Sequence, residues 1–432
     1  MSGYFPLAIH LFLQLTIILA VCRIVGRLLR PLRQTQVVSE MVAGVLLGPS
    51  LLGLLAPDVQ NFLFPRGASM SILYALSQVG LTLYMFLIGL ELNRGLLVQH
   101  SRDAVVVSLS GVLTPMVMGG ALGAAIGGND QLFTEGIATW QAALFVASAM
   151  SITAFPMLAR ILYESGMAQT KIGTLAISAA AFDDASAWCL LACVLATVKG
   201  SFAIAALAIG GGAAYALFMV LVGRRWFRWF DRVTRRDDGV RGETLAVLLL
   251  VLMLCAWFTD LIGIYSVFGA FVCGVVMPRG LFAQEVRRMI EPLTVSLLLP
   301  IFFVYSGLNT RIQLLVEPSL LGITVATIVI AFLCKGGGCG VASRWVGAPW
   351  RDAATIGVLM NARGLMELIL VNIALEKGLI THGLFTILVL MAIITTLAAS
   401  PLFHWIYGRQ KESALAPRTA SESGSSSFGA GL

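Results

Sequence analysis

The sequence predicts an all-α polytopic membrane protein, with about thirteen transmembrane helices in two inverted repeats of six around a connecting helix. Hydrophobic residues make up 58% of the 432 positions and charged residues 12%, whereas a soluble domain carries roughly 25% charged residues. Apolar windows of about 20 residues, the length that spans a bilayer, recur along the chain. Similar strings also occur at corresponding windows of the two halves.

The expected spans follow from the apolar windows, taken in chain order. They lie at residues 6–27, 36–54, 72–91, 104–126, 140–162, 172–197, 202–222, 243–262, 264–279, 293–308, 318–344, 353–375 and 382–406. The first window lacks the basic flank and cleavage site of a signal peptide, so we expect it to be retained. The ninth is the weakest, because only a short turn separates it from the eighth.

The loops predict the orientation. Those after odd-numbered spans are basic, as in "GRRWFRWFDRVTRRDDGVR", whereas those after even-numbered spans, such as "GGNDQLFTEG", are nearly neutral. Positive loops stay inside, so we expect the N-terminus outside and the C-terminus in the cytoplasm, in a bacterial inner membrane. The net charge of +7 then reflects topology and does not indicate nucleic acid. The chain has no GxxxxGK[ST] motif, so we expect no nucleotide and no ATP-driven transport.

Two pairs of strings indicate the internal repeat. "EMVAGVLLGPSLLG" (40–53) resembles "GAFVCGVVMPRGL" (269–281), and "LYMFLIGLELN" (83–93) resembles "PIFFVYSGLNT" (300–310). We therefore expect a membrane domain over 1–407, followed by a disordered Ser/Gly/Ala-rich cytoplasmic tail over 408–432. Its parts are repeat one (6–197), a connector (202–222) and repeat two (243–406). Since one span joins the halves, the second is inverted, a recurring transporter plan. The alternative is chance likeness between short Gly-rich strings.

Two adjacent acids and one lysine lie deep in apolar spans, where an ionisable group costs roughly 2.5–3.5 kcal/mol on insertion scales. Asp183 and Asp184 lie about eleven residues from the inner end of their span, and Lys335 about ten from the inner end of its own. Because the depths agree, an aspartate can supply the counter-charge for Lys335. The alternatives are an acid pair satisfied by hydroxyl groups and a lysine that reaches the inner surface.

The fifth span contains a helix breaker beside hydroxyl groups. Pro156 lacks the N–H that would bond the carbonyl of residue 152 and disfavours helix at the preceding residue. Ser151 and Thr153 lie next to this break. An interrupted helix frees carbonyls that can bind a small cation. An ordinary proline kink is the alternative.

The twelfth span contains a second polar group in "VLMNARGLMELILVN". Arg363 and Glu367 are four residues apart, so they share a helix face and can pair. Asn361 and Gly364 indicate a second interruption. By the repeat, the fifth span corresponds to the twelfth, so both breaks occupy equivalent places. A structural role for Arg363 and Glu367 is as consistent with the sequence as a direct role in transport.

At these residues the chain resembles the monovalent cation:proton antiporter-2 family, in the branch of plant cation/proton exchangers and their bacterial relatives. The similarity lies in "SITAFPMLARIL", "AAFDDASAW" and "GVLMNARGLMELILVN", and extends over residues 40 to 373. It implies two crossed, partly unwound helices and a homodimer formed through the first three spans of each half. It also implies that Asp184 binds the cation or proton, that Asp183 pairs with Lys335 and that Thr153 lines the site.

The function expected from these features is monovalent cation (Na⁺ or K⁺)/proton antiport by alternating access. Cation and proton exclude one another on Asp184, because either one neutralises a buried carboxylate. Two acids and a lysine favour electrogenic exchange; electroneutral potassium/proton exchange and a potassium efflux pathway are the alternatives. A cation channel and a proton-coupled symporter or drug exporter are rivals from other classes. We expect no enzyme activity and no resident cofactor or metal, apart from the cation held transiently by Asp184.

Overall fold

The protein is described by a computed structural model over residues 4–32, 34–65, 67–91, 101–167, 170–198, 202–237, 239–262 and 265–415. This part of the chain is almost entirely helical. The helices before the connector are α1 (Tyr4–Leu29), α2 (Gln36–Leu47), α3 (Leu52–Leu55), α4 (Pro57–Leu63), α5 (Ala68–Glu91), α7 (Ser101–Ile126), α8 (Thr139–Ser151), α9 (Phe155–Glu164) and α10 (Lys171–Val198).

The remaining helices start with α11. They are α11 (Phe202–Phe218), α12 (Arg224–Asp237), α13 (Gly242–Leu261), α14 (Ser266–Val276), α15 (Leu281–Leu293), α16 (Leu299–Leu308), α17 (Pro318–Trp345), α18 (Trp350–Leu359), α19 (Leu365–Glu376) and α20 (His382–Leu415). Among the described residues, eight helical stretches are long and apolar enough to cross a membrane. Each of the thirteen predicted windows overlaps one helix, or two helices separated by a break.

Several boundaries differ from the sequence prediction. Two predicted basic loops are helical: α12 lies after the seventh window, and α15 carries the tenth helix back to Leu281. Both were missed because their apolar residues form a stripe and not a continuous run; in α15 that stripe is Phe282, Val286 and Ile290. α20 continues to Leu415, past the boundary expected at residue 407, and residues 416–432 lie outside the described part.

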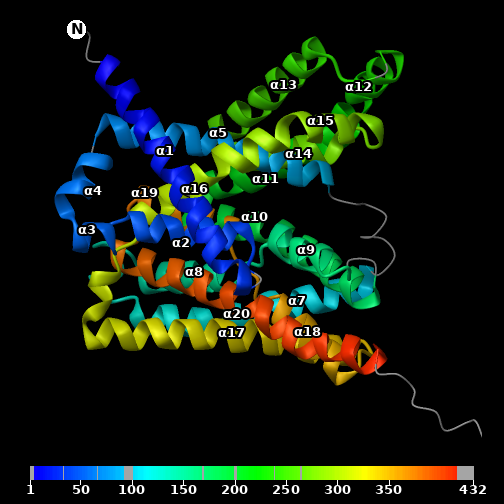
Figure 1. The fold of residues 1–432 in the computed structure, drawn as a ribbon. Helices are drawn as coiled ribbons and strands as arrows, with labels where there is room; N and C mark the ends of the chain where they lie inside the picture. Colours follow the sequence, from blue (N-terminus) through cyan, green and yellow to red (C-terminus); the bar gives the residue numbers. More distant parts are fainter. Residues whose placement is uncertain are drawn as a thin grey trace, which may run out of the picture.

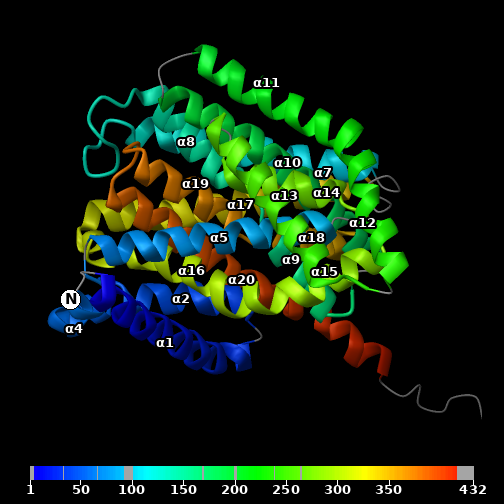
Figure 2. The same ribbon diagram turned by 90° about the horizontal axis from the view of Figure 1, so that it is seen from above.

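The buried apolar side chains form two clusters, which divide the helices into two bundles. The panel bundle contains α1 to α5 and α13 to α16, and the site bundle contains α7 to α10 and α17 to α20. In Figure 1, α5, α13 and α14 lie in the upper part of the molecule and α7, α17 and α18 in the lower part. Figure 2 shows α1 along one side and the connector helix α11 along the opposite side. α2, α5, α14 and α16 contribute to both clusters, so they form the contact between the bundles.

The panel bundle is built from two reciprocal helix pairs. α2 packs against α16, and α14 packs against α5. A Cβ atom on Gly307 would overlap the backbone of Gly44, and one on Gly274 would overlap the backbone between Phe86 and Leu90. The absent side chains let each helix pair approach backbone to backbone, as small residues do in membranes. Since α2 and α14 carry one pair of similar strings and α5 and α16 the other, exchanging the two halves reproduces the contacts.

Candidate functional site

Two helix interruptions meet inside the site bundle. α8 ends at Ser151 and α9 begins at Phe155, while α18 ends at Leu359 and α19 begins at Leu365. The backbone N–H of Ala154 in the first gap donates to the carbonyl of Ala362 in the second, at 2.9 Å. Pro156 occupies the second position of α9, where a missing N–H costs no helical hydrogen bond. The two extended segments therefore lie side by side and bring the polar residues of four helices together.

Two buried cations cover the carbonyl end of α8. Arg363 donates to the carbonyls of Ala149 (3.1 Å), Met150 (2.7 Å) and Ile152 (3.5 Å). Lys335 donates to the carbonyl of the intervening residue, Ser151. A helix end leaves four carbonyls without helical partners and carries partial negative charge, so both cations are well placed. In this conformation all four carbonyls that the sequence predicted to be available to a small cation accept hydrogen bonds from protein cations.

Asp183 is saturated with donors. Lys335 Nζ lies 2.9 Å from its Oδ2, and both side chains are fully buried. Thr153 Oγ1 donates to the same oxygen at 2.6 Å, and Ser108 Oγ donates to Oδ1 at 2.5 Å. Lys335 Nζ also donates to the carbonyl of Gly111 at 3.2 Å. Charge-assisted hydrogen bonds of this kind are stronger than neutral ones, so this geometry fixes the position of the Asp183 carboxylate.

Asp184, the adjacent residue on α10, has no such donors. It is 1% exposed, and neither carboxylate oxygen has a hydrogen-bond partner among the described residues. The backbone N–H of Phe155, at the start of α9, lies near the carboxylate without reaching hydrogen-bonding geometry. A helix N-terminus carries partial positive charge and attracts anions. An unpaired buried charge is costly, and no group among the described residues donates a hydrogen bond to the Asp184 carboxylate.

The other predicted residues take supporting positions. The Ser151 hydroxyl bonds the carbonyls of Ala147 (2.7 Å) and Val112 (3.1 Å), so it turns away from both aspartates. Asn361 donates to the carbonyl of Gly357 at 3.0 Å.

The predicted pair on α19 is loose. Arg363 Nη1 lies 3.5 Å from Glu367 Oε2, and the other carboxylate oxygen of Glu367 has no hydrogen-bond partner in the described part of the chain. Arg363 is therefore held mainly by carbonyls of α8 and only weakly by Glu367.

Sequence reasoning missed the residues that act through hydroxyl groups and backbone. Ser108 and Gly111 on α7 complete the surroundings of Asp183 and Lys335. Thr396 on α20 accepts from the N–H of Arg363 and donates to its carbonyl, both at 2.9 Å. A hydroxyl in an apolar helix usually bonds its own backbone and carries no detectable cost. No signal in the sequence therefore separates Ser108 from its neighbours.

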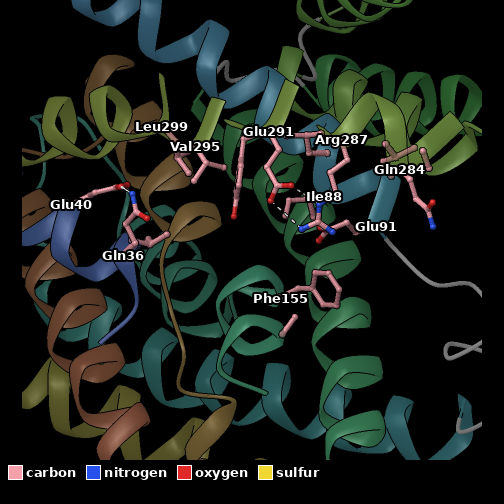
Figure 3. A pocket seen from close by; sticks show the side chains of 16 residues that line it. Gln36, Glu40, Ile88, Glu91, Phe155, Gln284, Arg287, Glu291, Val295 and Leu299 are labelled. Carbon is pink, nitrogen blue, oxygen red and sulfur yellow. Dashed lines mark hydrogen bonds and ion pairs between the residues drawn. The ribbon is translucent and has the colours of Figure 1, made fainter. Parts of the chain in front are cut away.

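A cleft of about 670 Å³ leads from the surface toward this site. Its walls come from α2, α5, α15 and α16 of the panel bundle and from α9 of the site bundle. Figure 3 shows Arg287 between Glu91 and Glu291 on one wall and Phe155 on the opposite side. Arg287 forms ion pairs with both acids. Phe155 lines the cleft, and its backbone N–H lies near the Asp184 carboxylate.

Comparisons with known proteins show the family of this chain. Residues 16–407 match the protein family described as "Sodium/hydrogen exchanger, transmembrane". The chain is 38% identical over 398 residues to the Na(+)/H(+) antiporter NhaS4 of Synechocystis, covering 91% of this chain and 96% of that protein. It is 31% identical over 421 residues to the K(+)/H(+) antiporter 1 of Saccharomyces cerevisiae, covering 93% of this chain but only 47% of the yeast protein.

A solved structure shows the same fold at low sequence identity. The structure of the sodium proton antiporter MjNhaP1 from Methanocaldococcus jannaschii at pH 8 aligns with a TM-score of 0.65 and 13% identity. The alignment covers 94% of this chain and 98% of that chain. The two proteins therefore share an all-helical, multi-pass membrane architecture.

Proposed function

This chain belongs to the sodium/hydrogen exchanger family, and on that premise we propose how it works. Members of this family are secondary transporters and not enzymes, and this chain exchanges a monovalent cation, Na⁺ or K⁺, for protons. We propose that exchange occurs by alternating access at Asp184, where cation and proton compete. The observation that carries this proposal is the contrast between two adjacent acids: among the described residues, Asp183 has three donors and Asp184 has none.

Competition at one carboxyl group is sufficient for exchange. Asp184 is neutralised either by a proton or by a monovalent cation, and the two cannot occupy the same oxygens together. With either ligand bound, the site bundle can move past the panel bundle without exposing a bare charge to the dry contact between them. The empty, charged carboxylate resists that movement. The cleft beside Phe155 supports one access path, which we assign to the cytoplasmic side because the basic loops lie there.

Asp183 and Lys335 have a second role in this proposal. They form one buried ion pair, and we assign the second exchanged proton to Lys335, which gives it up when the cation binds. Two protons then exchange for one cation, which makes transport electrogenic. Transport that does not respond to membrane potential indicates electroneutral exchange, and flux without proton counterflow indicates an efflux pathway.

The wider architecture completes the proposal. The thirteen helical windows form a 6+6 inverted repeat with α11 as the connector, supported by the reciprocal contacts of α2 with α16 and of α14 with α5. The interrupted helices cross at the site, supported by the bond between Ala154 and Ala362. We also propose a homodimer through the panel bundle, with the N-terminus outside. Mass photometry of the purified protein tests the dimer, and cysteine accessibility in intact cells tests the orientation.

Proteoliposomes containing a pH-sensitive dye test the role of Asp184. Addition of Na⁺ or K⁺ should release protons in vesicles with the wild type, and Asp184→Asn should abolish the signal. Asp58→Asn is the matched control, because Asp58 is an exposed acid on α4 and its loss should leave the flux unchanged. Undiminished cation-dependent proton flux in Asp184→Asn refutes the proposed site.

A further inference from the structure

The helix between the two repeats carries a pattern that transport does not explain. α12 contains six arginines against two aspartates, and it follows the connector α11 directly. Positive-inside topology requires basic residues in this loop but does not require them to form a helix with a defined face. α12 packs on α15 of the panel bundle, and Figure 2 shows both helices at the same end of the molecule.

One face of α12 packs against the rest of the protein. Phe227 and Phe230 are 7% and 3% exposed, and Thr234 is buried on the same side. The Phe230 ring lies 5.3 Å from that of Phe282 on α15, measured between centroids. This buried stripe fixes the rotation of the helix about its axis, so the directions of the remaining side chains are determined.

The tryptophans form a second face. Trp226 and Trp229 are 70% and 43% exposed, and at 100° per residue they lie within roughly 60° of each other on the helix. Leu217 and Leu221, just before α12, are also exposed at 59% and 62%. Exposed tryptophan that follows exposed apolar side chains is typical of the bilayer interface, where the ring lies at the level of the headgroups.

The arginines form a third face, opposite the buried one. Arg225, Arg228, Arg232 and Arg236 are all exposed and fall within roughly 80° of one another by the same helical geometry. Asp231 lies outside this arc and pairs with Arg235 at 3.1 Å. Guanidinium groups bind phosphate through two parallel hydrogen bonds. The arginine face therefore presents phosphate-binding groups beside a tryptophan face that marks the headgroup layer.

We propose that α12 is a binding site for anionic phospholipid headgroups in the cytoplasmic leaflet. The occupant is lipid because the apolar helices α11 and α13 hold α12 at the membrane surface from both ends. The leaflet is then within reach of the arginine face at all times. Headgroup phosphates bound there attach the panel bundle to the leaflet and brace it against movement of the site bundle. The site is independent of Asp184 and does not require the proposed exchange mechanism.

Native mass spectrometry and thermal unfolding of the full chain in detergent test this site. Phosphatidylglycerol should bind and raise the unfolding temperature, whereas phosphatidylcholine should not. Arg228→Gln combined with Arg232→Gln should weaken phosphatidylglycerol binding about 25-fold, at about fivefold per arginine. Arg228→Lys combined with Arg232→Lys keeps both positive charges and should therefore retain most of the binding. Arg23→Gln combined with Arg27→Gln removes two exposed arginines of α1 and should leave binding unchanged.

The remaining outcomes overturn the proposal. One is a wild type that does not prefer phosphatidylglycerol to phosphatidylcholine. Others are an α12 Gln variant that binds phosphatidylglycerol as tightly as the wild type does, or an α1 control that loses as much binding as the α12 variant. The last is soluble glycerol phosphate that competes fully with phosphatidylglycerol. The α12 variant should keep the wild-type unfolding temperature in phosphatidylcholine, because exposed arginines contribute little to the fold. A lower unfolding temperature of the α12 variant in phosphatidylcholine indicates that the arginines stabilise the fold, and it also contradicts the lipid site.

Discussion

Lys335→Met tests the buried pair that positions the site. The substitution keeps the length of the side chain and removes its charge and donors. Asp183 then keeps only the hydroxyl groups of Ser108 and Thr153 in a fully buried position. The carbonyls of Gly111 and Ser151 lose their shared donor.

The expected loss can be divided into two parts. Leaving one charge of a buried pair without its partner costs about 3–5 kcal/mol, and an unpaired buried carbonyl costs about 1–3 kcal/mol. Asp183→Asn added to Lys335→Met removes the first part, because one hydroxyl can still donate to the amide oxygen while the other accepts from the amide nitrogen. The second part persists. The pair should therefore show a coupling energy of about 3 kcal/mol between the two sites.

Thermal unfolding in detergent, followed by size-exclusion fluorescence, measures this cycle. Lys335→Met should lower the midpoint by on the order of 5 °C or more, and the double variant should recover about half of that loss. Lys377→Met is the control, because Lys377 is exposed at the end of α19 and its removal should change nothing. A Lys335→Met variant as stable as the wild type, or one that the second substitution does not rescue, refutes the assignment.

Three further predictions concern the same bundle. Arg363→Lys should destabilise by about 2–4 kcal/mol, because an ammonium cannot reproduce the fork that spans three carbonyls; thermal unfolding measures it, and a neutral result contradicts the cap on α8. Gly338→Ala should destabilise by about 1–3 kcal/mol, because its Cβ lies 2.6 Å from Thr114 Oγ1. Gly337→Ala, with nothing within 4 Å, should be neutral or slightly stabilising in the same assay; equal losses for both glycines contradict the packing. Ser108→Ala should cost about 1.5–3 kcal/mol and lower the cation transport rate, since it removes one hydrogen bond to an ionised group; proteoliposome flux checks the second effect.

The sequence was sufficient to locate the charged part of the site. Ionisable groups in apolar spans stand out because the membrane makes them expensive, and counting residues from the span ends assigned similar depths to Asp183 and Lys335, which the structure brings to 2.9 Å. The interruptions were also readable, since proline and glycine mark breaks in helices directly. The contact between the two gaps was not predictable, because it is formed by backbone groups, which every residue has.

The remaining features depend on tertiary packing that composition does not encode. The contact of Arg363 with the carbonyl end of α8 was not predictable, because Arg363 lies in the gap between α18 and α19, more than 200 residues away in the sequence. The role of Ser108 could not be predicted either, because its hydrogen-bond partner lies on another helix. α12 and α15 escaped detection by apolar windows, although the spacing of Phe227 and Phe230 was a helical signal. Amphipathic helices at a membrane surface need a periodicity test and not a hydropathy test.

The pH dependence of cation affinity tests the central claim, competition at Asp184, most directly. In proteoliposomes the apparent KM for Na⁺ or K⁺ should rise about tenfold for each unit of falling pH in the acidic limb, because mass action makes the proton a competitive ligand. The maximal rate at saturating cation should change little over the same range. An apparent KM independent of pH, with protons lowering only the maximal rate, contradicts a shared carboxyl group.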